Sequence, residues 1–233
     1  MKTVAIIQAR MSSTRLPGKC CLPLAGKTAL WYTVRRCLRS EEVDTVCVAT
    51  TTNPVDDHIV NYVAEEFGGM DVACYRGSEN DVLQRTIEAA RFNEADIIVD
   101  VTSDCPMVDH TMITAMVNKF KTKSSLYISN VKPRTVPDGL DIQVYRADTL
   151  KRIMETVLVL EREHSGWNIA RYAKRGERSL YYPKAIARRP DLRWTLDTPE
   201  DHQFLQRFMS WCVKDYGAFF TAEQAMWIHE VLA

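Results

Sequence analysis

Short apolar runs alternate with segments of helical periodicity through the first half of the chain. Runs such as Val4 to Ile7 have the length and composition of strands buried on both faces. Between them, apolar residues recur every three or four positions, as in an amphipathic helix, and Thr28 is placed to cap the first of these helices. The predicted strands lie at 4–7, 46–49, 72–75 and 97–101, and the predicted helices at 30–38, 55–67, 82–92 and 112–120.

The alternation of strand and helix predicts an α/β fold of three layers, Rossmann-like, with a mainly parallel sheet and helices on both of its faces. After about residue 122 the rhythm changes, and we expect a small β-rich inserted element at about 123–185 within one domain that spans 1–233. Here the predicted strands are 126–131, 140–145 and 180–182, and the predicted helices are 148–160 and 165–174, followed by 199–211 and 221–231.

The composition is that of an ordinary globular protein, with 46% hydrophobic and 26% charged residues. No apolar run approaches the roughly 18 residues that span a bilayer, and the apolar stretch near the N-terminus is too short for a signal peptide. We therefore expect a cytoplasmic protein. The seven cysteines contain no C-x-x-C pair, which predicts neither a disulfide framework nor a zinc site.

Charge is distributed unevenly, although the net charge is zero. Zero net charge argues against a nucleic-acid or membrane-surface binder. The first 40 residues hold eight Lys or Arg and no acid, whereas residues 41–110 hold sixteen acids and three basic residues. This division predicts an anionic ligand, a metal ion, or both. Of the sixteen acids we assign only Asp104 to chemistry and expect most others on a solvated surface.

The loop that follows the first predicted strand carries the clearest chemistry. It concentrates cations and hydroxyl residues directly after a buried strand, where ligands bind in open parallel sheets. Arg10, Arg15 and Lys19 suit phosphate oxygens, and small residues at Ser12 and Ser13 allow backbone N–H groups to approach the same anion. A dinucleotide-binding G-x-G-x-x-G is absent from the sequence, and Gly26-Lys27-Thr28 is no Walker A because Cys21 stands where its first glycine belongs.

Two aspartates are candidate metal ligands. Asp104 follows the predicted strand 97–101 in a turn closed by Pro106, and Asp197 precedes a helix that Thr198 is expected to cap. Mg²⁺ takes one or two protein carboxylates and completes its shell with water and substrate phosphates, so two isolated aspartates fit it. A turn or helix-capping role is the alternative for Asp104.

The segments Ala9-Arg10-x-x-Ser13-Thr14-Arg15-Leu16-Pro17-Gly18-Lys19 and Leu24-Ala25-Gly26-Lys27 closely resemble the nucleotide-binding loop of the 3-deoxy-manno-octulosonate and acylneuraminate cytidylyltransferases. The opening with Gln8 is most similar to the spore-coat polysaccharide branch, and the similarity extends to about residue 205. The resemblance implies nucleotide contacts from the loop and later turns and supports metal binding by Asp104 and Asp197. The implied nucleotide-binding residues are Ala9, Arg10, Ser12, Ser13, Arg15, Lys19, Arg76 and Ser103, of which Arg10, Arg15 and Lys19 are the catalytic cations.

Further residues are assigned to the acceptor by resemblance alone. They are Asp81, Asp138, Asp141 and His164, each of which has a structural alternative as a helix-start or turn residue. The turn that contains Ser103 departs from the Gly-Asp-Glu-Pro of the octulosonate enzymes. An acidic acceptor needs a cation, and the candidates are Arg134, Arg162 and Arg171.

The resemblance implies a Mg²⁺-dependent cytidylyltransferase that moves CMP from CTP to a sugar acid or related phosphorylated acceptor, releases pyrophosphate, and serves cell-surface polysaccharide biosynthesis. It also implies a homodimer formed through 123–185. A glycosyltransferase that uses a nucleotide sugar is one alternative, but such enzymes usually carry an Asp-x-Asp pair that this sequence lacks. A nucleotide-sensing module is the other, and it would need the loop without both metal aspartates.

Overall fold

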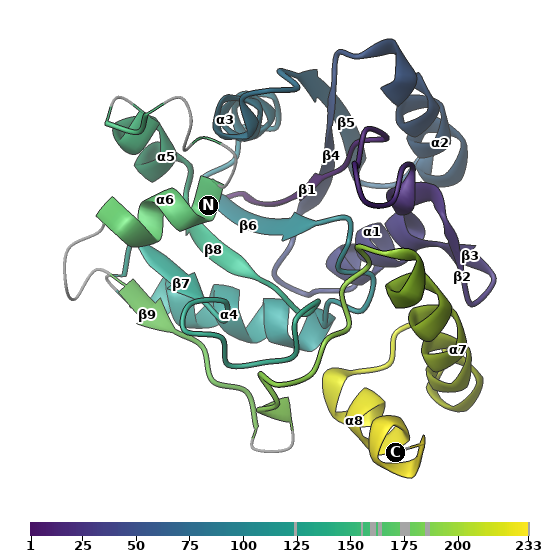
Figure 1. The fold of residues 1–233 in the computed structure, drawn as a ribbon. Coiled ribbons are helices and arrows are strands. Elements are labelled where there is room, and N and C mark those ends of the chain that lie inside the picture. The colour runs from purple at the N-terminus through teal and green to yellow at the C-terminus, as the bar shows by residue number, and fades with distance from the viewer. Residues whose placement is uncertain are drawn as a thin grey trace.

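A sheet of seven strands forms the middle layer of the protein (Figure 1). The computed structural model describes residues 1–123, 125–154, 156–158, 162, 165–172, 178–184 and 187–232. The strand order is β5-β4-β1-β6-β8-β7-β9 among these residues. Four strands, β5, β4, β1 and β6, run parallel, and β8 turns antiparallel to β6. The strands are β1 (Thr3–Gln8), β4 (Thr45–Thr51), β5 (Val72–Gly77), β6 (Ile97–Thr102), β7 (Tyr127–Ser129), β8 (Gln143–Arg146) and β9 (Arg178–Leu180).

Helices pack on both faces of this sheet, because successive residues of each strand point to opposite sides. In β1, Ala5 and Ile7 join the apolar cluster of one face, whereas Val4 and Ile6 join that of the other. The first face carries α1 (Ala29–Leu38), α2 (Asp57–Phe67), α4 (His110–Thr122), α7 (Pro199–Tyr216) and α8 (Ala222–Leu232). The second carries α3 (Val82–Phe92), α5 (Ala147–Met154) and α6 (Ser165–Tyr172). The predicted three-layer α/β fold is confirmed.

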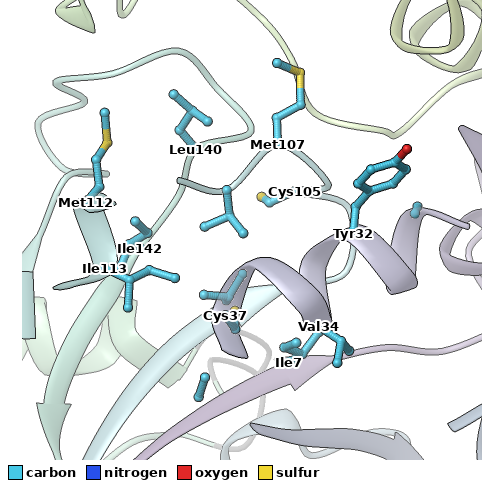
Figure 2. Packing of buried hydrophobic residues seen from close by; sticks show 14 of the residues in the cluster. Ile7, Tyr32, Val34, Cys37, Cys105, Met107, Met112, Ile113, Leu140 and Ile142 are labelled. Carbon is cyan, nitrogen blue, oxygen red and sulfur yellow. The ribbon is translucent and has the colours of Figure 1, made fainter. Parts of the chain in front are cut away.

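Helix α1 shows how the core is filled (Figure 2). Val34 and Cys37 lie over Ile7 of β1, and Ile113 of α4 approaches from the side. Leu140 and Ile142 enter the same cluster ahead of β8, so the segment that precedes this strand is held against the sheet. This packing matters for function because the same segment carries Asp138 and Asp141.

Several predicted boundaries shift in the structure. Strand β8 begins at Gln143 rather than at residue 140, and β9 ends at Leu180 instead of spanning 180–182. Helix α7 continues to Tyr216, five residues beyond its predicted end. A hairpin of β2 (Pro23–Leu24) and β3 (Lys27–Thr28) was not predicted, because strands of two residues are too short to show a periodicity. No described helix has the length and apolar character to cross a membrane.

Arg36 has a structural role that its place in the basic N-terminal region does not reveal. It is fully buried, lies 4.0 Å from the ring centroid of Phe220, and donates to the carbonyl oxygen of Phe220 at 2.8 Å. Burial lowers the pKa of Arg36 to about 10. Arg36 therefore ties the segment before α8 to α1, and it is not available to a ligand.

Candidate active site

The loop that follows β1 has little regular secondary structure, and hydrogen bonds from its backbone N–H groups hold it in place. Asp56, which ends the 3-10 helix η2 (Pro54–Asp56), accepts the Met11 N–H at 2.7 Å and a hydroxyl hydrogen bond from Thr51. The Gly18 N–H bonds to the Met11 carbonyl at 2.9 Å, and Gly18 adopts φ +68°, which favours glycine. The loop therefore closes on itself and directs its cations over the sheet edge.

Asp56→Ala is expected to lower the free energy of unfolding by about 2–3 kcal/mol, because it leaves the Met11 N–H and the buried Thr51 hydroxyl without their acceptor. CTP binding should weaken as well, since the loop loses its anchor. Urea unfolding measures the first effect. The matched control is the exposed neighbour in Asp57→Ala, which should cost less than about 0.5 kcal/mol. Equal losses in the two variants would show that the buried anchor does not stabilise the loop.

Lys19 joins the two predicted metal ligands. It begins the 3-10 helix η1 (Lys19–Cys21), and its Nζ donates to Asp104 Oδ2 at 2.6 Å and to Asp197 Oδ1 at 2.8 Å. Burial alone would lower the pKa of Lys19, but the two carboxylates outweigh burial and raise this pKa above its usual value. Two carboxylates that lie 93 positions apart in the sequence therefore converge on one cation.

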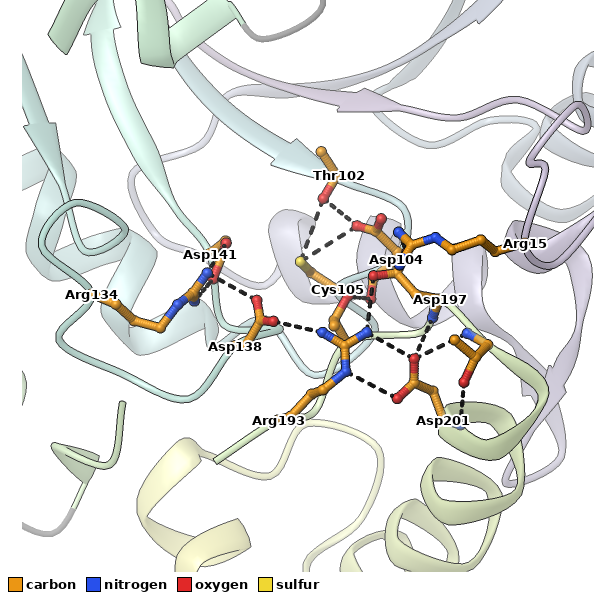
Figure 3. Close-up of polar contacts among 12 residues, drawn as sticks. Arg15, Thr102, Asp104, Cys105, Arg134, Asp138, Asp141, Arg193, Asp197 and Asp201 are labelled. Atoms are coloured by element: carbon orange, nitrogen blue, oxygen red, sulfur yellow. Dashed lines mark hydrogen bonds and ion pairs between the residues drawn. The ribbon is translucent and has the colours of Figure 1, made fainter. Parts of the chain in front are cut away.

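Asp197 is positioned by the start of α7 (Figure 3). Thr198 caps the helix and forms a capping box with Asp201, whose carboxylate also accepts the Asp197 N–H at 2.9 Å. Arg193 donates to Asp197 at 3.1 Å and to Asp201 at 2.9 Å. Burial opposes ionisation of Asp197, but Lys19, Arg193 and Arg15 lower its pKa below the usual value. Asp197 is therefore an anion held in a fixed place.

Two cavities open at this sheet edge and share one wall. The first, of about 320 Å³, is lined by Gln8, Ala9, Arg10, Ser13, Thr14, Arg15, Lys19, Val82, Arg85, Thr102, Ser103, Asp104 and Asp197. The second, of about 520 Å³, is lined by Asp100, Val101, Thr102, Asp104, Cys105, Tyr127, Val131, Lys132, Asp138, Asp141, Gln143, Thr195 and Asp197. We call them the loop cavity and the strand cavity. The shared residues are Thr102, Asp104 and Asp197.

The loop cavity is rich in cations. Besides Arg10, Arg15 and Lys19 it contains Arg85 of α3, which is 2% exposed and donates to Gln8 at 3.0 Å and to the Ser78 carbonyl. Burial lowers the pKa of Arg85 to about 10. A concentration of guanidinium and ammonium groups at a strand end fits a polyphosphate.

The far wall of the strand cavity is acidic. Arg134 bonds to both carboxylate oxygens of Asp141 and lies 2.9 Å from Asp138, while Arg193 approaches the other oxygen of Asp138 at 2.8 Å. Figure 3 shows this chain of charges running from Arg134 to Asp197. Gly139, at φ +109°, permits the close approach, because a Cβ there would lie 2.4 Å from the Trp194 backbone. The loop that carries Asp138 therefore packs directly on the segment that carries Asp197.

Asp100 lies at the base of the strand cavity. It sits on β6, is 6% exposed, and accepts a hydrogen bond from the Tyr145 hydroxyl at 2.8 Å. Burial raises the pKa of Asp100 to about 6, although the bonds from Tyr145 and the Gly166 backbone partly oppose the shift. None of the ion pairs in the described part of the chain involves Asp100.

Asp100→Asn is expected to stabilise the protein at neutral pH. The folded state holds the Asp100 proton more tightly than the unfolded chain, so stability falls as pH rises from about 4 to about 6 and stays reduced above that range. The variant should gain roughly 1–3 kcal/mol at pH 7 and almost nothing at pH 4. Urea unfolding at both pH values tests this, with the exposed Asp71→Asn as control. A loss of stability at pH 7 would contradict it.

The remaining predicted residues are placed as follows. Ser12 donates to Glu79 at 2.8 Å, and Arg76 pairs with Asp57 and donates to the carbonyl of Thr51 at 2.9 Å. Asp81 caps α3 by accepting the Gln84 N–H, and it also pairs with Arg162 at 2.9 Å. His164 lies outside the described residues. The nucleotide and acceptor roles of these residues stay predictions.

Three residues that matter here were not predicted from the sequence. They are Asp56, Arg85 and Asp100. The acids of 41–110 other than Asp104 lie mostly on the surface, as expected, and the exceptions are Asp56, Asp100 and Asp109, which are buried. The sequence could have indicated Asp100, because it follows apolar residues within a predicted buried strand. An acidic side chain is seldom buried unless it has a partner or a function.

The shared wall suits a magnesium ion. Among the described side chains there is no group of three or more His, Cys, Asp or Glu side chains arranged around a common point. Mg²⁺ needs only one or two carboxylates and takes its other oxygens from water and phosphate. Asp104 and Asp197 meet that requirement, since one oxygen of each already lies within hydrogen-bond distance of a single positive charge.

A cationic strand-end loop that meets two carboxylates at one edge of a mainly parallel sheet is typical of an α/β nucleotidyltransferase. Comparison with known proteins identifies the family of this nucleotidyltransferase, because the cytidylyltransferase family profile matches residues 4–228. The chain belongs to the cytidylyltransferase family.

Individual relatives agree with this assignment. The spore coat polysaccharide biosynthesis protein SpsF of Bacillus subtilis is 30% identical over 212 residues, which cover 86% of this chain and 83% of that protein. The 3-deoxy-manno-octulosonate cytidylyltransferase of Trichlorobacter lovleyi is 35% identical over 134 residues, 58% of this chain and 51% of that enzyme. The solved structure of a cytidylyltransferase from Leptospira borgpetersenii superposes with a TM-score of 0.88 at 30% identity, covering 100% of this chain and 95% of that one.

Proposed function

We propose that this enzyme transfers CMP from CTP to a small sugar acceptor in a Mg²⁺-dependent reaction that releases pyrophosphate, for cell-surface polysaccharide biosynthesis. The observation that carries the proposal is the wall of Asp104, Lys19 and Asp197 between a cationic cavity and an acidic one. Such a wall separates the site of a triphosphate from the site of its acceptor. The relative named for spore coat polysaccharide biosynthesis supports the biological role.

The chain's own residues would act mainly by position and charge. CTP occupies the loop cavity, where Arg10, Arg15 and Lys19 hold the β- and γ-phosphates together with backbone N–H groups near Ser12 and Ser13. An acceptor oxygen attacks the α-phosphorus in line, and the bond to the bridging oxygen breaks. The departing pyrophosphate takes both electrons of that bond, and the three cations neutralise its charge.

Asp104 and Asp197 would hold the magnesium ion. When bound, the ion withdraws charge from the phosphate oxygens and lowers the pKa of a nearby hydroxyl. Lys19 then faces the phosphates with one or both of its carboxylate contacts released. An acceptor phosphate needs no base, whereas an acceptor hydroxyl must pass its proton to water.

The acceptor class follows from the family resemblance, which favours a sugar acid or a related phosphorylated compound. The resemblance assigns Asp138 and Asp141 to its binding, and both line the strand cavity. The nucleophile is then a hydroxyl or a phosphate oxygen of a compound small enough to enter a cavity of about 520 Å³.

A pyrophosphate-release assay tests the proposal. Each of the four NTPs is paired with a panel of acidic sugars, sugar phosphates and polyol phosphates, with and without Mg²⁺. We expect release with CTP, a divalent ion and at least one acceptor. Release with no pairing, or release that needs no divalent metal, would overturn the proposal. Consumption of a nucleotide sugar instead would favour a glycosyltransferase, and CTP binding without turnover would favour a sensing module.

We further propose that two copies associate through the element at about 123–185. Two large apolar side chains in its described part are exposed, Leu158 at 68% and Tyr182 at 54%, and burial of such side chains against a second copy would favour association. Sedimentation velocity should show a dimer at micromolar concentration. The double variant Leu158→Ser and Tyr182→Ser should shift it toward the monomer, and an unchanged dimer would place the interface elsewhere.

A further inference from the structure

The lining of the strand cavity carries mainly negative charge, and a bound acceptor must be electrostatically complementary to it. Beyond the shared wall, the described residues present three carboxylates, Asp100, Asp138 and Asp141, against a single lysine, Lys132. A purely anionic acceptor would place its charge against these oxygens. The wall is therefore suited to groups that donate hydrogen bonds or carry positive charge.

Two of the three arginines that the sequence offered to an acidic acceptor form ion pairs within the protein. Arg134 is engaged by Asp138 and Asp141, and Arg162 is engaged by Asp81. Burial opposes the charge of Arg134, yet the hydrogen bond and the charge of Asp141 raise its pKa above the usual value. These ion pairs satisfy Arg134 and Arg162, so among the described residues the cations best placed for an anionic group are Lys19 and Arg15 near the shared wall.

Asp100 differs from Asp138 and Asp141, the other two carboxylates that line the strand cavity outside the shared wall. Asp138 and Asp141 each contact arginine, whereas Asp100 has a hydroxyl and a backbone N–H as donors and forms no ion pair with any described side chain. A buried carboxylate without a counter-charge is costly. Because Asp100 lines the cavity, a bound ligand can supply the missing positive charge.

We propose that the acceptor carries an ammonium group on the same sugar as its reacting group and that Asp100 binds this ammonium group. This inference rests on the proposed function. The reacting end of the acceptor, with its phosphate or carboxylate, lies at the shared wall near Asp104, Asp197 and Lys19, and the ammonium group lies at Asp100 in the strand cavity. An amino-sugar phosphate and a sugar acid with a free amine share this chemistry, so the test includes both.

Calorimetry on the intact protein, loaded with Mg²⁺ and a non-hydrolysable methylene analogue of CTP, tests the proposal without turnover. One matched pair of probes is glucosamine 1-phosphate and glucose 1-phosphate, which differ in an ammonium against a hydroxyl. The other is neuraminic acid as its stable methyl glycoside and the same glycoside of N-acetylneuraminic acid, which differ in a free against an acylated amine.

We expect the amine of at least one pair to bind about ten-fold tighter or more, the size of a hydrogen bond between charged groups. In Asp100→Asn this preference should fall below about three-fold, whereas in the control Asp71→Asn it should persist. No preference in either pair, a preference that survives in Asp100→Asn, or no binding of any probe would each overturn the proposal.

Two further measurements distinguish a failure of the ammonium proposal from a failure of the proposed function. Binding of the CTP analogue, measured in the same way, should be equal in wild type and Asp100→Asn. If the analogue fails to bind the wild-type protein, the proposed function fails; if it binds and the probe pairs do not differ, only the ammonium group is wrong. The urea unfolding of Asp100→Asn shows that any loss of preference does not arise from an unfolded chain.

Discussion

Lys19→Ala is expected to lower turnover by about 10² or more, the effect of removing one preorganised electrostatic stabiliser. The Lys19 ammonium lies within 2.6 Å of Asp104 and 2.8 Å of Asp197, in the wall between the two cavities. Alanine removes a cation from the leaving group and leaves two carboxylates facing each other. The measurement is the rate of pyrophosphate release at saturating CTP, with the acceptor that the panel identifies.

The same variant has a second, independent readout. Without the ammonium, repulsion between Asp104 and Asp197 should lower the melting temperature, and Mg²⁺ should restore more of it than in the wild type, because an ion that binds the folded state stabilises it. Lys121→Ala is the control, since this lysine pairs with Glu42, lines neither of the two cavities and should leave turnover unchanged. Turnover near the wild-type rate in Lys19→Ala would remove Lys19 from the catalytic machinery.

Asp197→Asn is expected to reduce turnover by a similar factor, about 10² or more. Asparagine keeps the shape of the side chain and loses its charge, so Lys19, Arg15 and Arg193 each lose an anionic partner and the magnesium ion loses one of two carboxylates. The apparent Mg²⁺ requirement should rise, which a purely structural role would not produce. Titration of the rate against Mg²⁺ measures this requirement.

The control for this variant is Asp191→Asn. Asp191 is an exposed carboxylate that also pairs with an arginine, Arg189, but it lies outside the two cavities. It should leave both the rate and the Mg²⁺ requirement as in the wild type. Equal rates for Asp197→Asn and Asp191→Asn would show that Asp197 does not hold the metal.

The main layers of the fold could be predicted because its strands and helices are long enough to show a period. The parallel strands β1, β4, β5 and β6 all appear as apolar runs. The antiparallel direction of β8 could not be predicted in this way, since a strand of four residues carries no sign of its direction. Its place beside β6 depends on contacts with residues far along the chain.

The candidate site could be predicted where its chemistry lies in one segment. Arg10, Arg15 and Lys19 are close in sequence and line one cavity. Arg85 could not be recognised, because a single arginine on an amphipathic helix is usually on the surface and only the approach of α3 to Gln8 buries it. The basic, acid-free first 40 residues indicated the ligand site only in part, because one of their arginines, Arg36, is buried against Phe220 and does not reach the site.

The hydrogen bond between Lys19 and Asp197 spans 178 positions, so the site cannot form until the chain has been made as far as α7. Local helices such as α1 can form early, whereas a contact of this sequence separation closes only when the segment around α7 has docked. A growing chain on the ribosome therefore cannot bring Asp104 and Asp197, the two proposed metal ligands, together until the segment around Asp197 has emerged. Any activity that needs both carboxylates thus depends on the docking of this late segment.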